Sequence, residues 1–296
     1  MEVRERRQLA LMLAPYLLGL AVLVALPAAV TFGLAFSEYD LIRSPGFLGL
    51  DNFRELAGDE VFRTALVNSL VFAAIAAPLR LLGALGLALL LHRRFFGVGT
   101  ARSAAVLPTV VPEIAYGLLW LWLLNPLYGP VNLALGPVAG WLGRQPPQWL
   151  TMPNDARAGI ILMSLFTIGE GFVILLVTRQ GLPRELYELA AVEGAPPEVV
   201  FWRITLPLMA PVLLLLFLRD TIFSLQMSFV PALVVTEGGP PPYSTTYLPL
   251  FVYRNAFEYL RYGYAAAATL VMFGLTLLVV LVQWRVLRRW RRGFGL

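Results

Sequence analysis

Six apolar stretches, each about twenty residues or longer, constrain the fold of this 296-residue chain more than any other feature. A helix rises about 1.5 Å per residue, so about 20 apolar residues cross the roughly 30 Å hydrocarbon core of a bilayer. Backbone polar groups inside that core must bond within the chain, which favours helices. The sequence therefore predicts an all-α, multi-pass membrane protein with spans at about 9–36, 65–91, 104–124, 158–178, 212–235 and 264–284.

Composition excludes several classes of function. Charged residues make up 14% of the chain, against about 25% in a soluble domain. All 23 basic residues are arginines, so no lysine is present to hold nucleotide phosphates or to form a Schiff base. With His92 as the single histidine and no cysteine, disulfides and Cys/His zinc sites are absent. Any ATP hydrolysis would therefore take place in another chain. No nucleophile and base appear at a workable spacing either, so we expect no enzymatic activity, no metal and no cofactor in this chain.

The arginines also predict the orientation. Fourteen of them flank the spans on one side and seven lie on the other, and short cytoplasmic loops carry the excess of positive charge. The net charge of +5 is thus explained by topology, and nucleic acid is not expected as a partner. The first stretch is too long for a signal-peptide core and lacks a cleavage site, so we expect it to be retained. The sequence predicts a single membrane domain over 1–296 with both termini in the cytoplasm.

Aromatic residues gather near the expected outer boundary, where amphipathic rings favour the headgroup region of the bilayer. They are Tyr128, Trp141, Trp149, Tyr259, Tyr262 and Tyr264. We expect these residues to act as interfacial anchors.

The loop between the fourth and fifth spans is much longer than the two to eight residues that neighbouring helices need. Its segment 183–207 has proline and glycine residues at the positions where two short helices of a hairpin would begin and end. Pro183 suits a first helical position, Gly194 can take the left-handed conformation that ends a helix, and Pro197 can open the next one. Pro207 is expected to limit the second helix.

The first helix of this hairpin has one small, mostly apolar face. Leu186, Leu189, Ala190 and Glu193 lie at i, i+3, i+4 and i+7. Two interpretations are equally compatible with this periodicity. The face either packs against helix ends of the same chain or docks into another protein.

The hairpin resembles the EAA motif of the inner-membrane permeases of binding-protein-dependent ABC importers. The motif residues here are Glu188, Ala190 and Gly194, followed after nine residues by Ile204, Leu206 and Pro207. Other stretches are similar to the carbohydrate-uptake branch, of the maltose and glycerol-phosphate type: Gly49-Leu-Asp-Asn-Phe53, Asn68-Ser69, Leu107-Pro108, Asn125-Pro126, Pro183-Arg-Glu-Leu-Tyr187 and Gly238-Gly239-Pro240. Two positions depart from the family pattern, Leu189 in place of alanine and Glu193 in place of aspartate.

The resemblance implies the permease subunit of an ABC importer that moves a sugar or oligosaccharide into the cytoplasm. Its partners would be a second permease subunit, favoured as a different chain, two ATPase subunits that bind ATP and Mg, an extracytoplasmic solute-binding protein, and the bilayer of the inner membrane. The coupling residues implied for contact with the ATPase are Glu188, Leu189, Ala190, Glu193, Gly194, Ile204, Leu206 and Pro207. A non-sugar solute such as a polyamine is the nearer alternative.

Ionisable residues within spans cost about 2.5–3.5 kcal/mol each and need a partner or a wet cavity. Glu113, Glu170, Asp220, Arg80 and Arg219 fall in or near spans. A proton-coupled carrier would use the three carboxylates, whereas in a structural interpretation they pair with the two arginines. The second interpretation is favoured.

Planar polar groups and aromatic rings suit the hydroxyls and the apolar faces of sugars. Candidates for the solute path are Tyr116, Trp120, Ser224, Gln226, Ser228 and Phe229. Each of these residues also has the alternative of simple packing or lipid contact.

Overall fold

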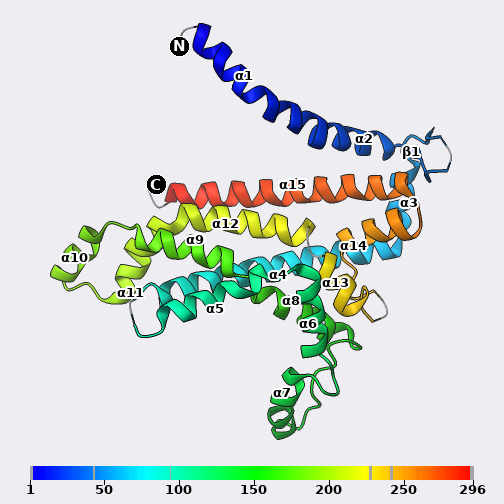
Figure 1. Cartoon of the computed structure of the whole chain (residues 1–296). Helices are drawn as coiled ribbons and strands as arrows, with labels where there is room; N and C mark the ends of the chain where they lie inside the picture. Colours follow the sequence, from blue (N-terminus) through cyan, green and yellow to red (C-terminus); the bar gives the residue numbers. More distant parts are fainter. Residues whose placement is uncertain (1–2, 43, 94, 227–228, 241–242, 294–296) are drawn as a thin grey trace. The chain divides into compact units, whose positions relative to one another are not determined.

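The computed structural model describes residues 3–42, 44–93, 95–226, 229–240 and 243–293 (Figure 1). Helices account for nearly all of the regular structure, which confirms the all-α class. Two short strands, β1 (Ser37–Glu38) and β2 (Gly46–Phe47), pair antiparallel with Ser37 opposite Phe47. The chain forms two compact units, each described below by itself. The single domain expected over 1–296 stays a prediction.

Four described helical segments are long and apolar enough to cross a membrane: Gln8–Leu34, Glu60–Leu91, Pro197–Gln226 and Tyr262–Val286. Two bent pairs add a fifth and a sixth span if each pair counts as one: α5 (Val98–Val110) with α6 (Glu113–Leu123), and α8 (Pro153–Leu165) with α9 (Gly169–Gln180). The chain is therefore a polytopic helical protein with four to six candidate spans. The number six stays a prediction.

The first unit contains the described residues up to Asp59 together with Phe251–Phe273. Its elements are α1 (Val3–Leu20), the π-helical turn η1 (Ala21–Ala25), α2 (Leu26–Leu34), the strand pair, α3 (Asp51–Gly58), the end of α14 (Leu248–Tyr253), the π-helical turn η3 (Arg254–Glu258) and the first part of α15 (Tyr262–Gly293). The amide of Asn52 donates to the carbonyls of Ala35 and Ser37, both at 3.0 Å, and so ties α3 to the end of α2. The strand pair and α3 thus form a small folded segment after the Gln8–Leu34 span.

The second unit comprises Glu60–Leu250 and the chain from Gly274 onward. Helix α4 (Glu60–Leu91) packs against α8, α9 and α12 (Leu206–Gln226), and α5 packs against α9 (Figure 1). Small residues make these approaches close: Ala76, Ala77 and Ala88 are fully buried on α4. At Gly169 a Cβ atom would lie 2.8 Å from the carbonyl oxygen of Ala105, so only glycine lets α9 approach α5 this closely.

The third predicted span, 104–124, is not one continuous helix. Helices α5 and α6 meet at an angle of 104°. Between them, Val111 and Pro112 have extended ψ values of 132° and 136°. Proline lacks a backbone donor and keeps the preceding residue out of the helical region, so Val111-Pro112 forces the break.

The fourth predicted span, 158–178, is also broken, with a bend of 42° between α8 and α9. The last turn of α8 is tighter than an α-helix, because the N–H groups of Phe166 and Thr167 bond the carbonyls of Met163 and Ser164, three residues earlier. The hydroxyl of Thr167 also bonds the Ser164 carbonyl at 2.8 Å. These local hydrogen bonds thus provide partners for the backbone polar groups at the end of α8.

The expected limit at Pro207 is wrong, and the fifth candidate span begins before the predicted start at 212. Helix α11 (Pro197–Val200), the π-helical turn η2 (Phe201–Thr205) and α12 run together as one candidate span that ends at Gln226. The N–H of Leu206 donates to the carbonyl of Phe201, five residues back. This π-helical turn shifts the backbone hydrogen-bond pattern by one residue just before Pro207, which has no N–H to donate. Helix α13 (Phe229–Thr236) follows, and the two residues between α12 and α13 lie outside the described residues.

Two of the expected aromatic anchors are structural residues instead. Tyr264 is buried, and its hydroxyl donates to Asp59 at 2.7 Å within the first unit. Trp149 is buried beside α7 (Pro130–Trp141), and its indole N–H donates to Asn132 at 2.7 Å. The tyrosine hydroxyl and the indole N–H each have a hydrogen-bond partner in the protein, so neither requires a lipid headgroup as a partner. Trp141 remains exposed.

Asn132 provides the first stability test. Its amide donates to the carbonyls of Pro126 at 3.2 Å and Pro147 at 2.9 Å while its oxygen accepts the indole bond. Asn132→Ala leaves these buried groups unpaired, so we expect a loss of about 1–3 kcal/mol in unfolding free energy. Thermal unfolding of the purified protein measures this loss. Asn154→Ala, at an exposed position, is the control, and an equal effect of both substitutions would contradict the role of Asn132.

Candidate functional site

A cavity of about 320 Å³ lies in the second unit, beside the breaks of both bent helix pairs. Helix α4, the α5–α6 and α8–α9 pairs, α12 and α13 all contribute lining residues. Backbone that leaves the helical ladder at membrane depth is tolerated where it is buried in protein or lines a cavity. The two breaks meet this condition, because Val111, Thr167 and Ile168 line the cavity.

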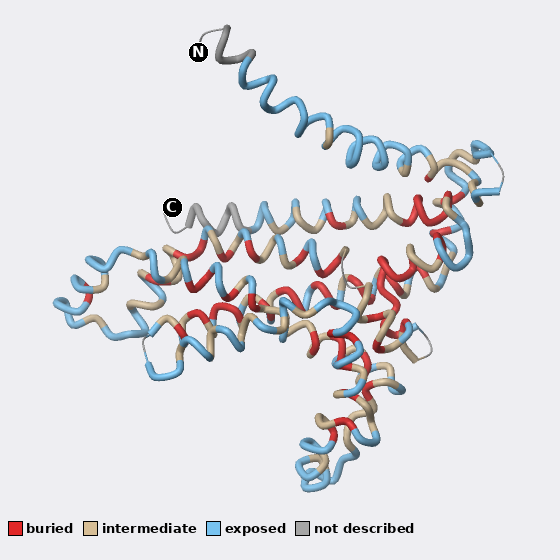
Figure 2. Tube along the Cα trace, viewed as in Figure 1, coloured by how far each residue is buried: buried red, intermediate tan, exposed pale blue. Residues whose placement is uncertain are grey.

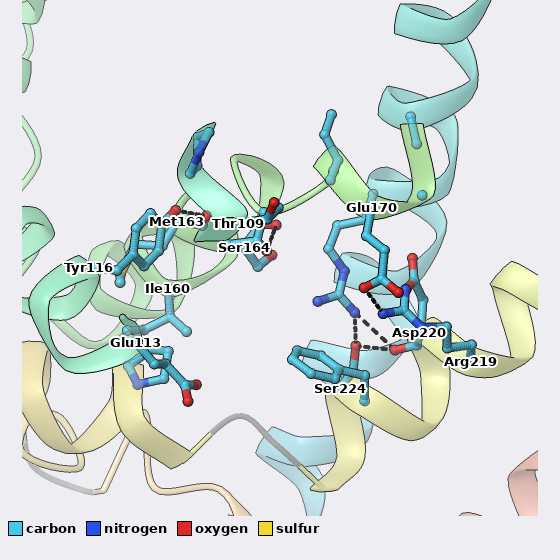
Figure 3. A pocket seen from close by; sticks show the side chains of 18 of the residues that line it. Thr109, Glu113, Tyr116, Ile160, Met163, Ser164, Glu170, Arg219, Asp220 and Ser224 are labelled. Carbon is cyan, nitrogen blue, oxygen red and sulfur yellow. Dashed lines mark hydrogen bonds and ion pairs between the residues drawn. The ribbon is translucent and has the colours of Figure 1, made fainter. Parts of the chain in front are cut away.

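One wall of the cavity is strongly charged (Figure 3). Arg219 of α12 forms an ion pair with Glu170 at the start of α9, and it lies 3.6 Å from its neighbour Asp220. Arg80 of α4 donates to the hydroxyl of Ser224 at 2.5 Å and to the backbone carbonyl of Asp220 at 2.9 Å. Three helices are therefore joined by one polar cluster.

Arg80 is the most deeply placed charge in this cluster, with 5% of its surface exposed. A buried guanidinium is tolerated only where its donors and its charge are compensated. Asp220 compensates the charge, and the Phe223 ring lies 5.6 Å from the guanidinium carbon. The Nε atom of Arg80 has no hydrogen-bond partner among the described residues.

The opposite wall is mostly apolar and aromatic (Figure 3). The hydroxyl of Tyr116 on α6 donates to the carbonyl of Met163 at 2.6 Å, and Ile160 lies beside it in the cavity lining. Glu113, at the start of α6, also lines the cavity. Its carboxylate forms no hydrogen bond or ion pair with any residue that the structure describes.

The cavity contains only some of the residues predicted for the solute path. Tyr116 and Ser224 line it, whereas Trp120 is buried in the core against Tyr116 and Phe166, with ring centroids 6.1 Å and 5.1 Å away. Gln226 ends α12 and Phe229 packs against the core. Ser228 lies outside the described residues.

The three carboxylates considered for a proton carrier all line this cavity. Glu170 and Asp220 are neighbours of Arg219, in agreement with the structural pairing that the sequence favoured, and Glu113 is not paired. Sequence reasoning did not include Met163, Ser164 and Thr167, which line the cavity next to the second break. The sequence Phe166–Gly169 contains no proline, so only its glycine could have indicated this break.

The second candidate site is the hairpin formed by α10 (Arg184–Val192) and α11. Gly194 follows α10 with a φ of +66°, as predicted. The N–H of Ala195 bonds the Ala190 carbonyl at 2.9 Å, and the N–H of Gly194 bonds the Ala191 carbonyl at 3.1 Å. These two bonds form a Schellman motif, which fixes the turn between the helices.

One side of α10 is held by the chain itself. Ala190 is buried, and the hydroxyl of Tyr187 bonds the hydroxyl of Thr205 at 3.0 Å. The guanidinium carbon of Arg179 lies 4.4 Å from the centre of the Tyr187 ring. The interpretation of packing against the chain's own helix ends therefore holds for this part of the face.

The other side of α10 is open. Leu189 is 61% exposed and Val192 is 85% exposed, and Glu188 and Glu193 are exposed beside them. Trp202 of η2 adds a third large exposed side chain. Ile204, Leu206 and Pro207 are half-buried at the junction with α12. Ala190 and Leu189 thus belong to different surfaces, although they are adjacent in the predicted motif.

Comparisons with known proteins agree with this architecture. Residues 81–292 match the family described as binding-protein-dependent transport system inner membrane component. The probable ABC transporter permease protein YesP of Bacillus subtilis (strain 168) is 30% identical, over 94% of this chain and 89% of its own length. The sulfoquinovosyl glycerol transport system permease protein SmoG of Agrobacterium fabrum is 30% identical, over 97% of this chain and 92% of its own length.

A solved structure has the same fold. It is described as a bacterial alginate ABC transporter in complex with an alginate pentasaccharide-bound periplasmic protein. The matching chain has a TM-score of 0.82 at 23% identity, with 98% of this chain and 96% of the other covered.

The ion pair between Arg219 and Glu170 provides a test of the cluster. Each single substitution, Glu170→Gln or Arg219→Gln, leaves one charge without its partner, whereas the double variant removes both. We expect the two effects on thermal stability to be non-additive, with an interaction energy of about 0.5–3 kcal/mol. Unfolding of the purified protein in detergent measures the cycle. Strictly additive effects would show that the two side chains do not interact.

Proposed function

The chain belongs to the family of binding-protein-dependent transport system inner membrane components, and we propose that it is the permease of an importer for a sugar or oligosaccharide. It is a multi-pass inner-membrane subunit of an ABC transporter, and ATP is hydrolysed by a partner. The similarity to SmoG over nearly the full length of both chains carries the proposal of a sugar-type solute. The cavity on this chain would form part of the solute path.

The lining of the cavity supports this proposal. Sugars offer hydroxyl groups on their edges and an apolar ring face. The charged wall, with Arg80, Ser224 and Asp220, suits the hydroxyls, and the wall with Tyr116 and Ile160 suits the ring face. Pockets for small molecules commonly combine an apolar lining with a few polar groups in this way.

The partners follow from the same proposal. A second permease subunit, favoured as a different chain, would complete the path, and two ATPase subunits would bind ATP and Mg. An extracytoplasmic binding protein would deliver the solute, as the solved alginate transporter carries such a protein. Both termini of this chain would lie in the cytoplasm.

The hairpin supports a coupling role. Leu189, Val192 and Trp202 would enter a cleft of an ATPase subunit, with Glu188 and Glu193 at the edge of the contact. The continuous helical segment Pro197–Gln226 joins this hairpin to the charged wall, because Asp220 and Ser224 lie near its far end. A movement of the hairpin would therefore reach the cavity through one rigid element.

The coupling role predicts a specific loss of function. Gly194→Pro places a residue with φ near −65° where the chain has +66°, and it removes the N–H that bonds Ala191. We expect uptake and solute-stimulated ATP hydrolysis to be abolished while the protein level in the membrane stays unchanged. Leu189→Arg should give the same loss without disturbing the turn, because Leu189 is exposed.

Gly181→Ala is the matched control for these variants. Gly181 has a φ of −84°, and an added Cβ would have only ordinary contacts of 3.5 Å or more. Uptake by this control should equal that of the unmodified protein. Normal transport by both Gly194→Pro and Leu189→Arg would refute the coupling role.

The driving force separates the importer from a proton-coupled carrier. In membrane vesicles loaded with ATP and supplied with the binding protein, uptake should continue after the proton gradient is collapsed. It should stop when ATP is withdrawn with the gradient intact. The reverse result would favour a carrier that uses Glu113, Glu170 and Asp220, and Glu113→Gln would then be expected to abolish uptake.

One observation favours a second solute class, a polyamine or another cation. Three carboxylates and two guanidiniums line the described cavity, and the carboxylate of Glu113 is the unpaired one. Competition between a neutral oligosaccharide, glycerol phosphate and a polyamine in the same vesicles separates the two candidates. Inhibition by the polyamine alone would replace the sugar in the proposal.

A further inference from the structure

The segment between α6 and α8 is nearly free of charge. From position 124 to position 152 its sequence contains a single ionisable charge of the Asp, Glu, Lys and Arg type, Arg144. A water-exposed segment of ordinary composition would carry about one charged residue in four. Helix α7 lies within this segment and has no charged residue.

The first turn of α7 is fixed by the chain. Val131 packs against the hydrophobic core, and Asn132 is held by the three hydrogen bonds to Pro126, Pro147 and Trp149. The turn before α7 is equally fixed, since a Cβ on Gly129 would collide with backbone oxygen of Leu123. The helix is therefore held in place independently of whatever covers its outer side.

The outward side of α7 is apolar and uncovered. Leu133 is 66% exposed, Val138 54% and Trp141 86%, and the tube of α7 in Figure 2 is largely pale blue. Leu133, Pro137 and Trp141 follow one another at spacings of four residues, which places them on one stripe of the helix, and Val138 lies beside Trp141 at i−3. Tyr128 is exposed just before the helix begins.

The length of α7 defines how it can meet a membrane. Its 12 residues span about 18 Å, which is too short to cross a hydrocarbon core of about 30 Å. Both ends of the segment continue into the bent pairs α5–α6 and α8–α9, which are candidate spans. The predicted orientation places the segment on the outer side of the membrane.

We propose that α7 lies in the outer headgroup region of the bilayer with its Leu133–Trp141 stripe in contact with lipid. The exposed apolar stripe of this uncharged helix favours lipid over water, and a Trp at one end with a Tyr before the other matches the amphipathic rings found at membrane interfaces. Zwitterionic lipid requires no compensating charge from the protein. The helix thereby anchors the outer ends of both broken spans beside the cavity.

The absence of cysteine from the chain makes a direct test simple. Single substitutions Leu133→Cys and Val138→Cys carry an environment-sensitive fluorophore, and Gln145→Cys, exposed just beyond Arg144, is the matched control. The complete transporter is reconstituted in phosphatidylcholine vesicles that contain lipids brominated at a known depth of the acyl chain. Uptake by each labelled variant is measured in the same vesicles.

We expect brominated lipid to quench the fluorophores at 133 and 138 several-fold more than the one at 145, and aqueous iodide to show the opposite order. Quenching of 133 and 138 by iodide alone would place the stripe in water and overturn the proposal. Protection of both positions from lipid and iodide would overturn it as well, since a protein partner would then cover the stripe. The result is independent of which solute is transported.

Discussion

The cost of an unbonded polar group in hydrocarbon governs this structure. It requires helices across the membrane, and it restricts where those helices can stop. Both breaks, at Val111-Pro112 and at Phe166–Ile168, border the same cavity. The same cost explains the cluster in which Arg80, Ser224 and Asp220 bond one another across α4 and α12. Irregular backbone and buried charge therefore occur together, at the cavity that we propose as part of the solute path.

The second important feature is the continuity of Pro197–Gln226. A π-helical turn before Pro207 lets the helix pass a residue that would otherwise end it. One end of this segment carries the hairpin with its Schellman turn at Gly194, and the other end carries Ser224. On the proposed mechanism, a single rigid element connects the ATPase contact to the solute path. Pro207 is then part of a junction and does not terminate the hairpin.

The sequence was most informative where local chemistry is decisive. Hydropathy predicted six apolar segments that overlap the four candidate spans and the two bent pairs, and the residues around Gly194 predicted a left-handed turn, because only a few residue types suit that conformation. It was less informative about partners in space. Trp149 and Tyr264 have the amphipathic character of interfacial anchors, yet their hydrogen bonds go to Asn132 and Asp59. Nothing along the sequence indicates which polar tip meets a distant acceptor.

By itself, the sequence determined that the chain is helical, where its apolar segments lie and that a helical hairpin separates two of them. These properties depend on the hydropathy and backbone preferences of residues close together in the chain. Only the tertiary structure decided that Arg80, Glu170, Arg219 and Ser224 share one wall of a cavity, and that Ala190 faces inward while Leu189 faces outward. These facts depend on how helices from distant parts of the chain pack, and packing is set by side-chain shape and burial across those helices rather than by local sequence.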